Sequence, residues 1–345
     1  MKTKTLYLLI SFVALTSCEE FFLGEEPKNN PMENFNQFWL DFDMHYAHFE
    51  LKNIDWDSVY SEYYPKITVN TSSQELLSYF KQIILPLKDA HVNIYTSWEV
   101  VNYNYYENSP LNSHVNLNKY INFLPSHENN EIMTYGHIKD YNLGYIMLKT
   151  FAGVGENLEH GDTRYFFIDK ILEEFDLKDG IIIDIRSNGG GNLSNAEVVA
   201  SRFADMERLY MKQKFKSGPN RNDFSEWYNH LIKPKGEKQF LKPVVVLTNK
   251  QVGSTSEGFV LAMKSLPQVT IVGDTTGGAS GNPVFRELPN GWTFRLSTSY
   301  SSTSYGVVFE GKGIPPDIPI WISEVDTQNG KDAIIEKAIE ILSTK

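Results

Sequence analysis

Residues 242–259, KPVVVLTNKQVGSTSEGF, contain the pattern that decides the fold. The apolar run at 244–247 predicts a strand that is buried on both faces. A small polar turn follows, and apolar residues then recur at helical spacing, at Phe259, Val260, Met263 and Leu266. Ser254 should therefore lie at a sharp strand-to-helix turn, near the free backbone N–H groups of the first helical turn.

This turn allows two interpretations. An acyl-transfer enzyme needs an exposed hydroxyl with hydrogen-bond donors where an oxyanion forms, and Ser254 meets that requirement. The alternative is structural, because Ser254 or Thr255 could simply cap the helix. The stretch alone favours capping, so the rest of the chain has to decide between them.

Strand and helix patterns alternate along most of the chain. Further strands are predicted over residues 92–95, 143–148, 180–185, 269–272 and 292–300, and helices over 163–175, 194–206 and 332–342. Residues 102–130 predict loop and irregular strand, and the polar residues 214–240 predict an excursion. The alternation indicates an α/β core built of crossover units.

Residues 34–87 have a helical pattern instead. Aromatic residues recur three and four apart near its start, and capping residues precede two further amphipathic stretches. The aromatic side chains fit a packed core better than a cofactor site. We therefore predict an N-terminal helical subdomain over residues 34–90 and an α/β core over residues 91–345.

The N-terminal residues predict export. Residues 1–17, MKTKTLYLLISFVALTS, combine two lysines with an apolar segment too short to span a membrane. Residues 15–18, LTSC, resemble a bacterial lipobox, in which Cys18 is lipidated and becomes the mature N-terminus. An ordinary secretory signal with a coincidental cysteine is the alternative. Acidic residues and prolines in residues 18–33 predict a tether, so we expect a lipid-anchored protein of the bacterial cell envelope.

The composition is that of an ordinary globular protein, with 41% hydrophobic and 22% charged residues. The net charge of −11 and the lack of a basic cluster in the sequence argue against a general nucleic-acid binder. Cys18 is the only cysteine, which excludes an internal disulfide framework and a cysteine-based metal site. The sequence has no internal repeat and predicts no mature membrane span.

A serine nucleophile needs a base, usually a histidine, and often a carboxylate behind it. Among the eight histidines, His91 follows Asp89 and Ala90 where a helix gives way to a strand, a place from which a side chain can reach a cleft. Alone, such a histidine is more often structural. His45 and His48 have a spacing that could suit a metal, but no third ligand stands out, so we interpret them as surface or partly packed residues.

Residues 184–191, DIRSNGGG, follow a strand and open a helix. Their glycines let a backbone approach a ligand closely with its N–H groups turned inward. A phosphate cradle is one interpretation, but the dinucleotide pattern lacks its last glycine and the Walker lysine is absent. An oxyanion hole and a plain turn are the others.

Four segments together resemble the tail-specific, or C-terminal processing, serine peptidase family, and most closely its tricorn and interphotoreceptor retinoid-binding-protein branch. They are LKDAHV at 87–92, residues 180–191, residues 249–259 and FEGKGIPPD at 309–317, in the family's order. The resemblance covers most of the chain between residues 34 and 322. It implies a crotonase/ClpP-like core and a polypeptide substrate. No metal or cofactor is required, and the segment from His91 to Tyr145 is too short for a full PDZ domain.

The resemblance also implies roles for the matching positions. Ser254 falls where the family's nucleophile lies, His91 matches the general base, and Glu310 matches the carboxylate that completes the relay. The N–H of Thr255 would form half of the oxyanion hole. A glycine of the pair Gly189 and Gly190 would supply the other half.

Two positions depart from the family pattern. Residues 277–281, GGASG, contain no lysine where the Ser–Lys branch has its base, which makes His91 the necessary base. Ala90 stands where the family often has Ser or Gly, which weakens the relay if that serine orients it. These departures motivate an alternative, an inactive envelope protein that binds a peptide or an apolar ligand. A hydrolase of a non-peptide ester is a third possibility, and the oligomeric state stays open.

Overall fold

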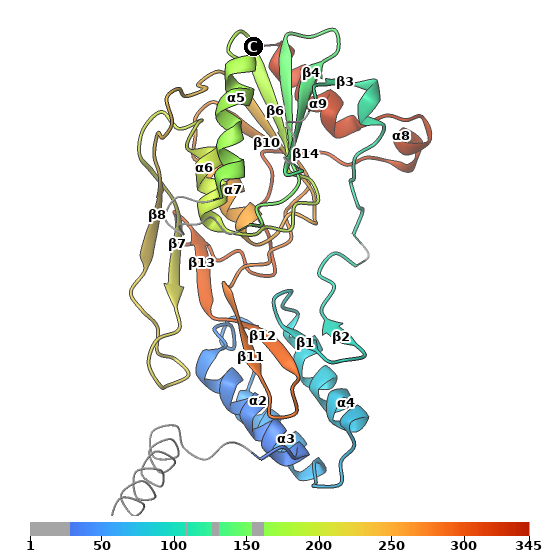
Figure 1. Ribbon diagram of the computed structural model, residues 1–345, viewed down its shortest axis with the longest axis vertical. Coiled ribbons are helices and arrows are strands. Elements are labelled where there is room, and N and C mark those ends of the chain that lie inside the picture. Colours follow the sequence, from blue (N-terminus) through green and yellow to red (C-terminus); the bar gives the residue numbers. More distant parts are fainter. Residues whose placement is uncertain (1–27, 108, 126–130, 154–161, 345) are drawn as a thin grey trace, which may run out of the picture.

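The computed structural model describes residues 28–344, apart from residue 108 and residues 126–130 and 154–161. The predicted signal peptide and Cys18 lie outside the described residues. Figure 1 shows an α/β core in its upper half and the N-terminal helices below it. Within the described part, none of the helices is both long enough and apolar enough to cross a bilayer.

The core is a seven-stranded sheet in the order β14-β10-β9-β6-β5-β4-β3. Strands β14 to β5 pair in parallel, and β4 and β3 add an antiparallel edge. The bounds are β3 (Ile121–Phe123), β4 (Met133–Ile138), β5 (Leu143–Leu148), β6 (Gly180–Asp184), β9 (Val244–Thr248), β10 (Val269–Gly273) and β14 (Ile318–Pro319). The predicted mixed α/β fold is confirmed.

Helices cover both faces of this sheet, which explains why its central strands β6 and β9 are buried at every position and mostly apolar. The helices α5 (Phe167–Glu174), α6 (Leu193–Ala200) and α7 (Thr255–Lys264) lie on one face, and α9 (Ala333–Ser343) lies on the other (Figure 1). Along β9, Val244 and Val246 belong to the hydrophobic cluster that includes residues of α5, α6 and α7. Val245 and Leu247 belong to the cluster that includes residues of α9. Helix α6 ends at Ala200, six residues earlier than predicted.

The predicted excursion over residues 214–240 is wrong. Strand β7 (Arg208–Phe215) and strand β8 (Tyr228–Ile232) form a hairpin that pairs with β13 (Ser299–Thr303) in a second, antiparallel sheet. Most side chains of β8 are exposed or half-buried. Antiparallel strands with one solvated face carry many polar residues, so the sequence of β8 resembles a loop.

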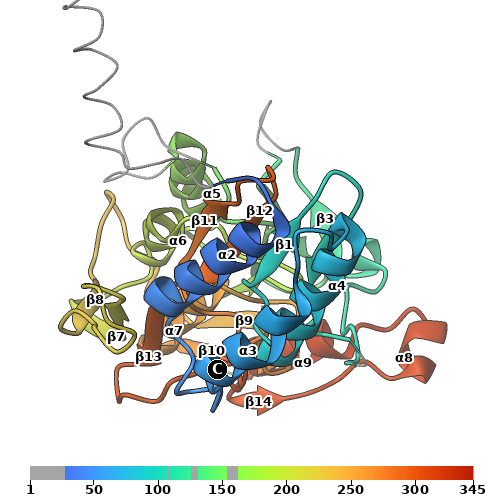
Figure 2. The same cartoon turned by 90° about the horizontal axis from the view of Figure 1, so that it is seen from below.

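The predicted N-terminal helical region is present as α2 (Pro31–His45), α3 (Trp56–Tyr63) and α4 (Ser73–Ile84). Helix α2 begins within the segment that was predicted as a tether. The helices pack on a third sheet, ordered β11-β12-β1-β2, and Figure 2 shows them in front of β1 and β12. Its strands are β1 (Asn93–Tyr95), β2 (Val100–Asn102), β11 (Pro283–Glu287) and β12 (Thr293–Ser297).

Segments from early and late in the sequence pack together in this region. The ring of Phe294 in β12 lies 5.3 Å from that of Phe38 and 5.7 Å from that of Phe42. Only Thr298 separates β12 from β13, so one continuous stretch serves two sheets. The described residues between His91 and Tyr145 are likewise divided between two sheets and form no separate PDZ domain.

Candidate active site

Ser254 lies at a strained turn between β9 and α7. Its backbone has φ 58° and ψ −130°, whereas a helix-capping residue normally has extended backbone angles. The backbone N–H of Ser254 is 2.8 Å from the carbonyl oxygen of Ala279 and 3.2 Å from Oε2 of Glu257. Ser254 thus occupies the N-cap position of α7 in a conformation that resembles the nucleophile turn of serine hydrolases.

Glu257 fixes the segment that faces this turn. Its carboxylate is fully buried and accepts hydrogen bonds from Thr276 Oγ1 (2.6 Å) and from the N–H groups of Gly278 (2.8 Å) and Ala279 (2.9 Å). Burial raises the pKa of Glu257 to about 7, although these hydrogen bonds oppose the rise. Glu257 therefore ties the start of α7 to residues 276–279.

His91 is buried, and its Nδ1 lies 2.7 Å from the carbonyl oxygen of Ser280. A carbonyl oxygen only accepts, so Nδ1 carries a proton and Nε2 of the neutral ring keeps its lone pair. Burial lowers the pKa of His91, and the charges of Arg295 and His48 lower it further, against the opposing effects of Asp89 and Ser280. A neutral imidazole with an available lone pair is what a general base requires.

Asp89 holds the backbone of His91 in place. Its Oδ1 accepts from the N–H of His91 (2.9 Å) and from Ser297 Oγ (3.2 Å). Its Oδ2 accepts from the hydroxyl of Tyr46 (3.1 Å) and from Nδ1 of His48 (3.2 Å). Burial by itself would raise the pKa of Asp89, but the hydrogen bond and charge of His48 outweigh burial and hold it well below its usual range.

Glu310 contacts Ser280 and forms no hydrogen bond with His91. Its Oε2 accepts from the backbone N–H of Ser280 (2.7 Å) and from its hydroxyl (2.9 Å), and its Oε1 pairs with Nζ of Lys52 (3.1 Å). The expectation that Glu310 holds the imidazole directly is therefore corrected. Because Ser280 also accepts from His91, it connects the imidazole to the carboxylate. Burial raises the pKa of Glu310, and the neighbouring charge of Asp89 raises it further.

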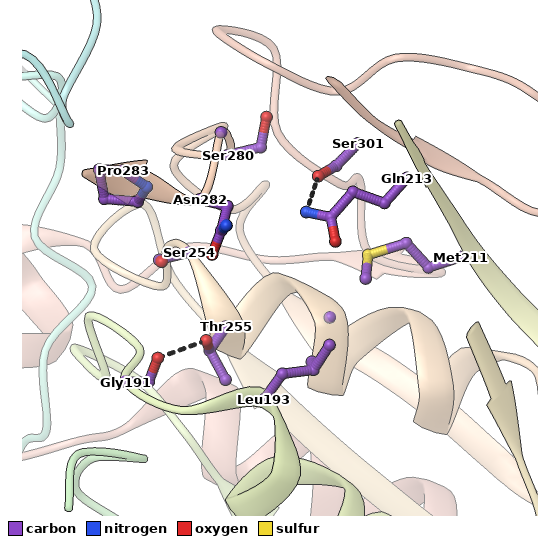
Figure 3. Close-up of a pocket in the computed structure, with 12 residues that line it drawn as sticks. Gly191, Leu193, Met211, Gln213, Ser254, Thr255, Ser280, Asn282, Pro283 and Ser301 are labelled. Carbon is purple, nitrogen blue, oxygen red and sulfur yellow. Dashed lines mark hydrogen bonds between the residues drawn. The ribbon is translucent and has the colours of Figure 1, made fainter. Parts of the chain in front are cut away.

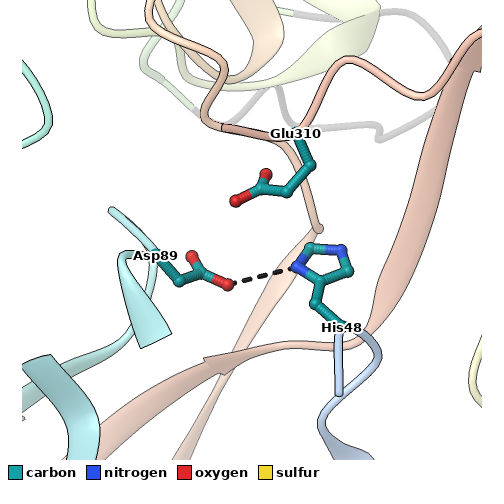
Figure 4. Close-up of side chains that lie close together, drawn as sticks. All are labelled: His48, Asp89 and Glu310. Atoms are coloured by element: carbon teal, nitrogen blue, oxygen red, sulfur yellow. Dashed lines mark hydrogen bonds and ion pairs between the residues drawn. The ribbon is translucent and has the colours of Figure 1, made fainter. Parts of the chain in front are cut away.

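His48 is fully buried, which corrects its interpretation as a surface or partly packed residue. Figure 4 shows its ring beside the carboxylates of Asp89 and Glu310, and ligand atoms of the three lie within 4.8 Å of one another. However, Nδ1 of His48 faces Asp89 and its Nε2 lies 2.8 Å from the carbonyl of Ser299. Both partners accept hydrogen bonds, so both nitrogens carry protons and neither can bind a metal. His48, Asp89 and Glu310 therefore fit an internal cluster of charged side chains better than a metal site.

The glycine loop packs against the nucleophile turn. Gly190 has φ 107°, and a Cβ at this position would lie 2.8 Å from Cβ of Ser254. The N–H of Gly190 donates to Asn188 Oδ1 (3.0 Å). The N–H groups of Gly189, Gly191 and Thr255 form no hydrogen bonds among the described residues. The loop and the start of α7 thus bring uncommitted donors to the neighbourhood of Ser254.

A cavity of about 130 Å³ opens beside Ser254 (Figure 3). Figure 3 shows Ser254 and Thr255 on one side of it and Met211 and Gln213 on the other. The side-chain amide of Gln213 donates to Ser301 Oγ (3.2 Å). The lining contains apolar and neutral polar side chains and no charged ones, so this pocket can receive an uncharged side chain of a ligand.

A strained serine at a strand-to-helix turn, a buried neutral histidine and free N–H groups define a serine-hydrolase type of site on an α/β fold. The signature of Peptidase family S41 matches residues 142–320, half of the sequence, and the chain belongs to this family. The signature of the Tricorn protease C1 domain matches residues 27–84. The resemblance to C-terminal processing and tricorn-like peptidases is thereby confirmed at the level of the family.

Individual relatives agree with this assignment. The carboxy-terminal processing protease CtpA of Bacillus subtilis is 28% identical over 186 residues, which cover 53% of this chain and 36% of that protein. The match thus spans about a third of the length of such curated relatives. A crystal structure classed as a peptidase from Parabacteroides merdae is 32% identical with a TM-score of 0.79, covering 91% of this chain and 97% of that one. Mature CPAF, at 13% identity and a TM-score of 0.68 over 91% of this chain and 96% of that one, shares the fold.

Four residues of the site were not predicted: Lys52, Asp89, Glu257 and Ser280. Asp89 and Ser280 lie inside segments that the sequence already singled out, 87–92 and 277–281, so their places in these segments were an available signal. Lys52 gives no local signal, because its partner Glu310 is distant in sequence.

Proposed function

We propose that this chain is a serine-type endopeptidase that hydrolyses peptide bonds through an acyl-enzyme on Ser254. The observation that carries the proposal is the hydrogen bond from Nδ1 of His91 to the carbonyl of Ser280. It leaves the Nε2 lone pair available for a proton. The neighbouring carbonyl, that of Ala279, holds the backbone of Ser254, so one short segment positions both nucleophile and base.

The proposed reaction begins when Nε2 of His91 takes the proton of Ser254 Oγ as that oxygen attacks the peptide carbonyl carbon. The N–H of Thr255 and one from the glycine loop receive the oxyanion. The loss of one such donor costs about 2.7–4 kcal/mol of transition-state stabilisation. The N–H of Gly190 is already engaged by Asn188, which leaves Gly189 or Gly191 as the second donor. His91 then protonates the leaving amine, and water releases the acyl group.

Glu310 supports the base through Ser280. Two hydrogen bonds from Ser280 to the carboxylate fix this residue, and its carbonyl fixes the imidazole tautomer. Ala90 lacks the hydroxyl that the family often has before the histidine, and the hydroxyl of Ser280 now contacts the carboxylate. The carboxylate of Glu310 thus positions the imidazole of His91 only through Ser280.

Two features outside the site complete the proposal. We infer that the α/β core is of the crotonase/ClpP type, as the resemblance implies. We also propose that Cys18 carries a lipid that anchors the protein in a bacterial cell envelope. The lipobox-like residues 15–18 support the anchor. Metabolic labelling with a fatty-acid analogue, compared between the parent and Cys18→Ala, tests it.

The alternative is an inactive binding protein on the same fold. The absence of a hydrogen bond between Ser254 and His91, both of which are described, favours it, together with Ala90. Yet a binding protein needs neither a strained serine nor a buried base with a free lone pair. These features support the peptidase.

Labelling by a fluorophosphonate probe tests the two functions. We expect the parent to be labelled, and Ser254→Ala and His91→Ala to stay unlabelled while remaining folded. A folded but unlabelled parent would move the conclusion to the binding protein. Turnover of a peptide panel against simple esters then separates a peptidase from an esterase, because a peptidase discriminates between side chains around the cleaved bond.

A further inference from the structure

A second cavity, of about 420 Å³, borders the segment that organises the site. Gly277 and Gly278 line this second cavity, whereas Ser280 and Gly281 line the pocket beside Ser254. Ala90, the residue before the candidate base, also lines it. Different residues of one short stretch, 277–281, therefore line the two cavities.

The lining of the second cavity is strongly basic. Lys52, Lys88, Lys250 and Lys312 contribute to it from four separate parts of the chain. The only acidic residue of the lining is Glu310, which is paired with Lys52 and hydrogen-bonded to Ser280. We call this cavity the lysine cleft.

Three of these lysines are not neutralised. Among the described residues, no carboxylate lies within 4.0 Å of the ammonium groups of Lys88, Lys250 or Lys312. The Nζ of Lys250 donates to the carbonyl of Thr276 (3.1 Å), which holds the side chain without cancelling its charge. In a chain with a net charge of −11, this local excess of positive charge creates a site for an anion.

The lysine cleft reaches the nucleophile turn. Tyr105 lines the cleft, and its hydroxyl lies 3.1 Å from the position of a Cβ built on Gly253, the residue before Ser254. The same hydroxyl donates to the carbonyl of Gln251 (3.4 Å). A polypeptide that places one bond at Ser254 can therefore extend into the cleft within a short length of chain.

We propose that the lysine cleft binds a carboxylate of the polypeptide whose cleaved bond lies at Ser254. This inference rests on the proposed function and names a substrate feature for it. The anionic groups of an unmodified polypeptide at neutral pH are Asp and Glu side chains and the C-terminal carboxylate. Lysine ammonium groups bind carboxylates as point charges without a fixed geometry, so the cleft accepts either source.

Binding to the full chain carrying Ser254→Ala tests the proposal without turnover. The probes are four octapeptides of one alanine–leucine sequence, labelled with an uncharged dye, with an internal Glu or Gln and a free or amidated C-terminus. We expect the amidated Gln peptide to bind most weakly in fluorescence anisotropy. A single carboxylate should strengthen binding by roughly two- to fivefold, and whichever carboxylate does so identifies the source.

Variants then localise the effect. Lys250→Gln with Lys312→Gln should abolish the preference for a carboxylate. The matched control, Lys170→Gln with Lys235→Gln, removes the same charge from exposed positions outside the cleft and should keep it. Equal or undetectable binding of all four peptides, or an equal loss in the control, would overturn the proposal. Fluorophosphonate labelling of the unmodified Ser254 decides the proposed function separately, because that probe carries no carboxylate.

Discussion

His91 and Glu310 both form hydrogen bonds with Ser280 and form none with each other. The imidazole donates to the carbonyl of Ser280 at 2.7 Å, and the carboxylate accepts from the N–H and hydroxyl of the same residue at 2.7 and 2.9 Å. The carboxylate therefore controls where the hydrogen-bond acceptor of the imidazole lies. Because both groups bind to Ser280, this residue is a positioning residue of the proposed peptidase.

Replacing Ser280 by Ala should lower kcat by about tenfold, because one hydrogen bond to a buried carboxylate is lost while the carbonyl that holds His91 remains. KM for a peptide substrate should change little. Glu310→Gln should reduce kcat as well, and the double variant should lose less than the product of the two single effects, since both act through one contact.

A suitable control for this cycle is Ser265→Ala, which removes a serine hydroxyl that only donates to the carbonyl of Ala262 within α7. Its kcat should equal that of the parent. Fully multiplicative effects of Ser280→Ala and Glu310→Gln would show that the two residues act independently and would contradict the linkage.

The pH dependence of kcat/KM reports on His91. Its base form is required, and burial lowers the pKa of this imidazole below the ordinary value of 6.5. The acidic limb of the activity profile should therefore be centred below pH 6.5. Initial rates with an uncharged peptide substrate between pH 4.5 and 8 check this. An acidic limb centred above pH 6.5 would show that the imidazole is stabilised in its charged form.

Glu257 should make the protein less stable as the pH rises toward neutrality. Its pKa is 4.5 in an unfolded chain and is raised by burial to about 7 in the fold. Between these values the folded state binds more protons than the unfolded state, so the free energy of unfolding falls with increasing pH and levels off above 7. The contribution lost between pH 5 and 8 is about 2–3 kcal/mol.

Urea unfolding of the parent and of Glu257→Gln over this pH range isolates the effect, because the other titrating groups are common to both. The parent should lose stability relative to the variant as the pH rises. A difference that stays constant or grows in the opposite direction would mean that the four hydrogen-bond donors around Glu257 keep it ionised throughout.

Arg186 should be important for stability rather than chemistry. Its guanidinium is fully buried, donates to Asp184 (Nη2 to Oδ2, 2.7 Å) and reaches Asp332 (Nη1 to Oδ1, 3.0 Å), joining the end of β6 to the start of α9. Arg186→Met removes the guanidinium that both buried carboxylates share and should cost about 3–5 kcal/mol of unfolding free energy. Arg208→Met, which breaks only the partly exposed pair with Asp205, should cost less than about 1 kcal/mol.

The local sequence pattern predicted the fully buried strands and the amphipathic helices. Strand β5 occupies the predicted residues 143–148, and the central β9–turn–α7 unit is where the sequence placed it, because buried strands and amphipathic helices carry their environment in their composition. Strands β7 and β8 escaped prediction because they are half-exposed. The break at Thr298 escaped because no local signal tells one sheet from another.

The same distinction applies to the site. The identities of Ser254, His91 and Glu310 followed from motifs, and their roles remain predictions. What the sequence could not supply is the set of contacts between distant positions. The burial of His48 depends on Asp89, 41 residues away, and the connection from His91 to Glu310 runs through Ser280, 189 residues beyond the histidine. Such contacts exist only once the chain has folded.

The packing of helix α2 against strand β12 has a consequence for when a newly made chain can become active. During synthesis, the histidine and the serine are made long before Phe294 completes the packing of the N-terminal helices and before Glu310 and its partner Ser280 can pair. A nascent or prematurely ended chain of 300 residues carries nucleophile and base but neither the carboxylate nor a complete lysine cleft. In the proposed peptidase, such a chain lacks the carboxylate that fixes Ser280, so it should be less active than the finished chain.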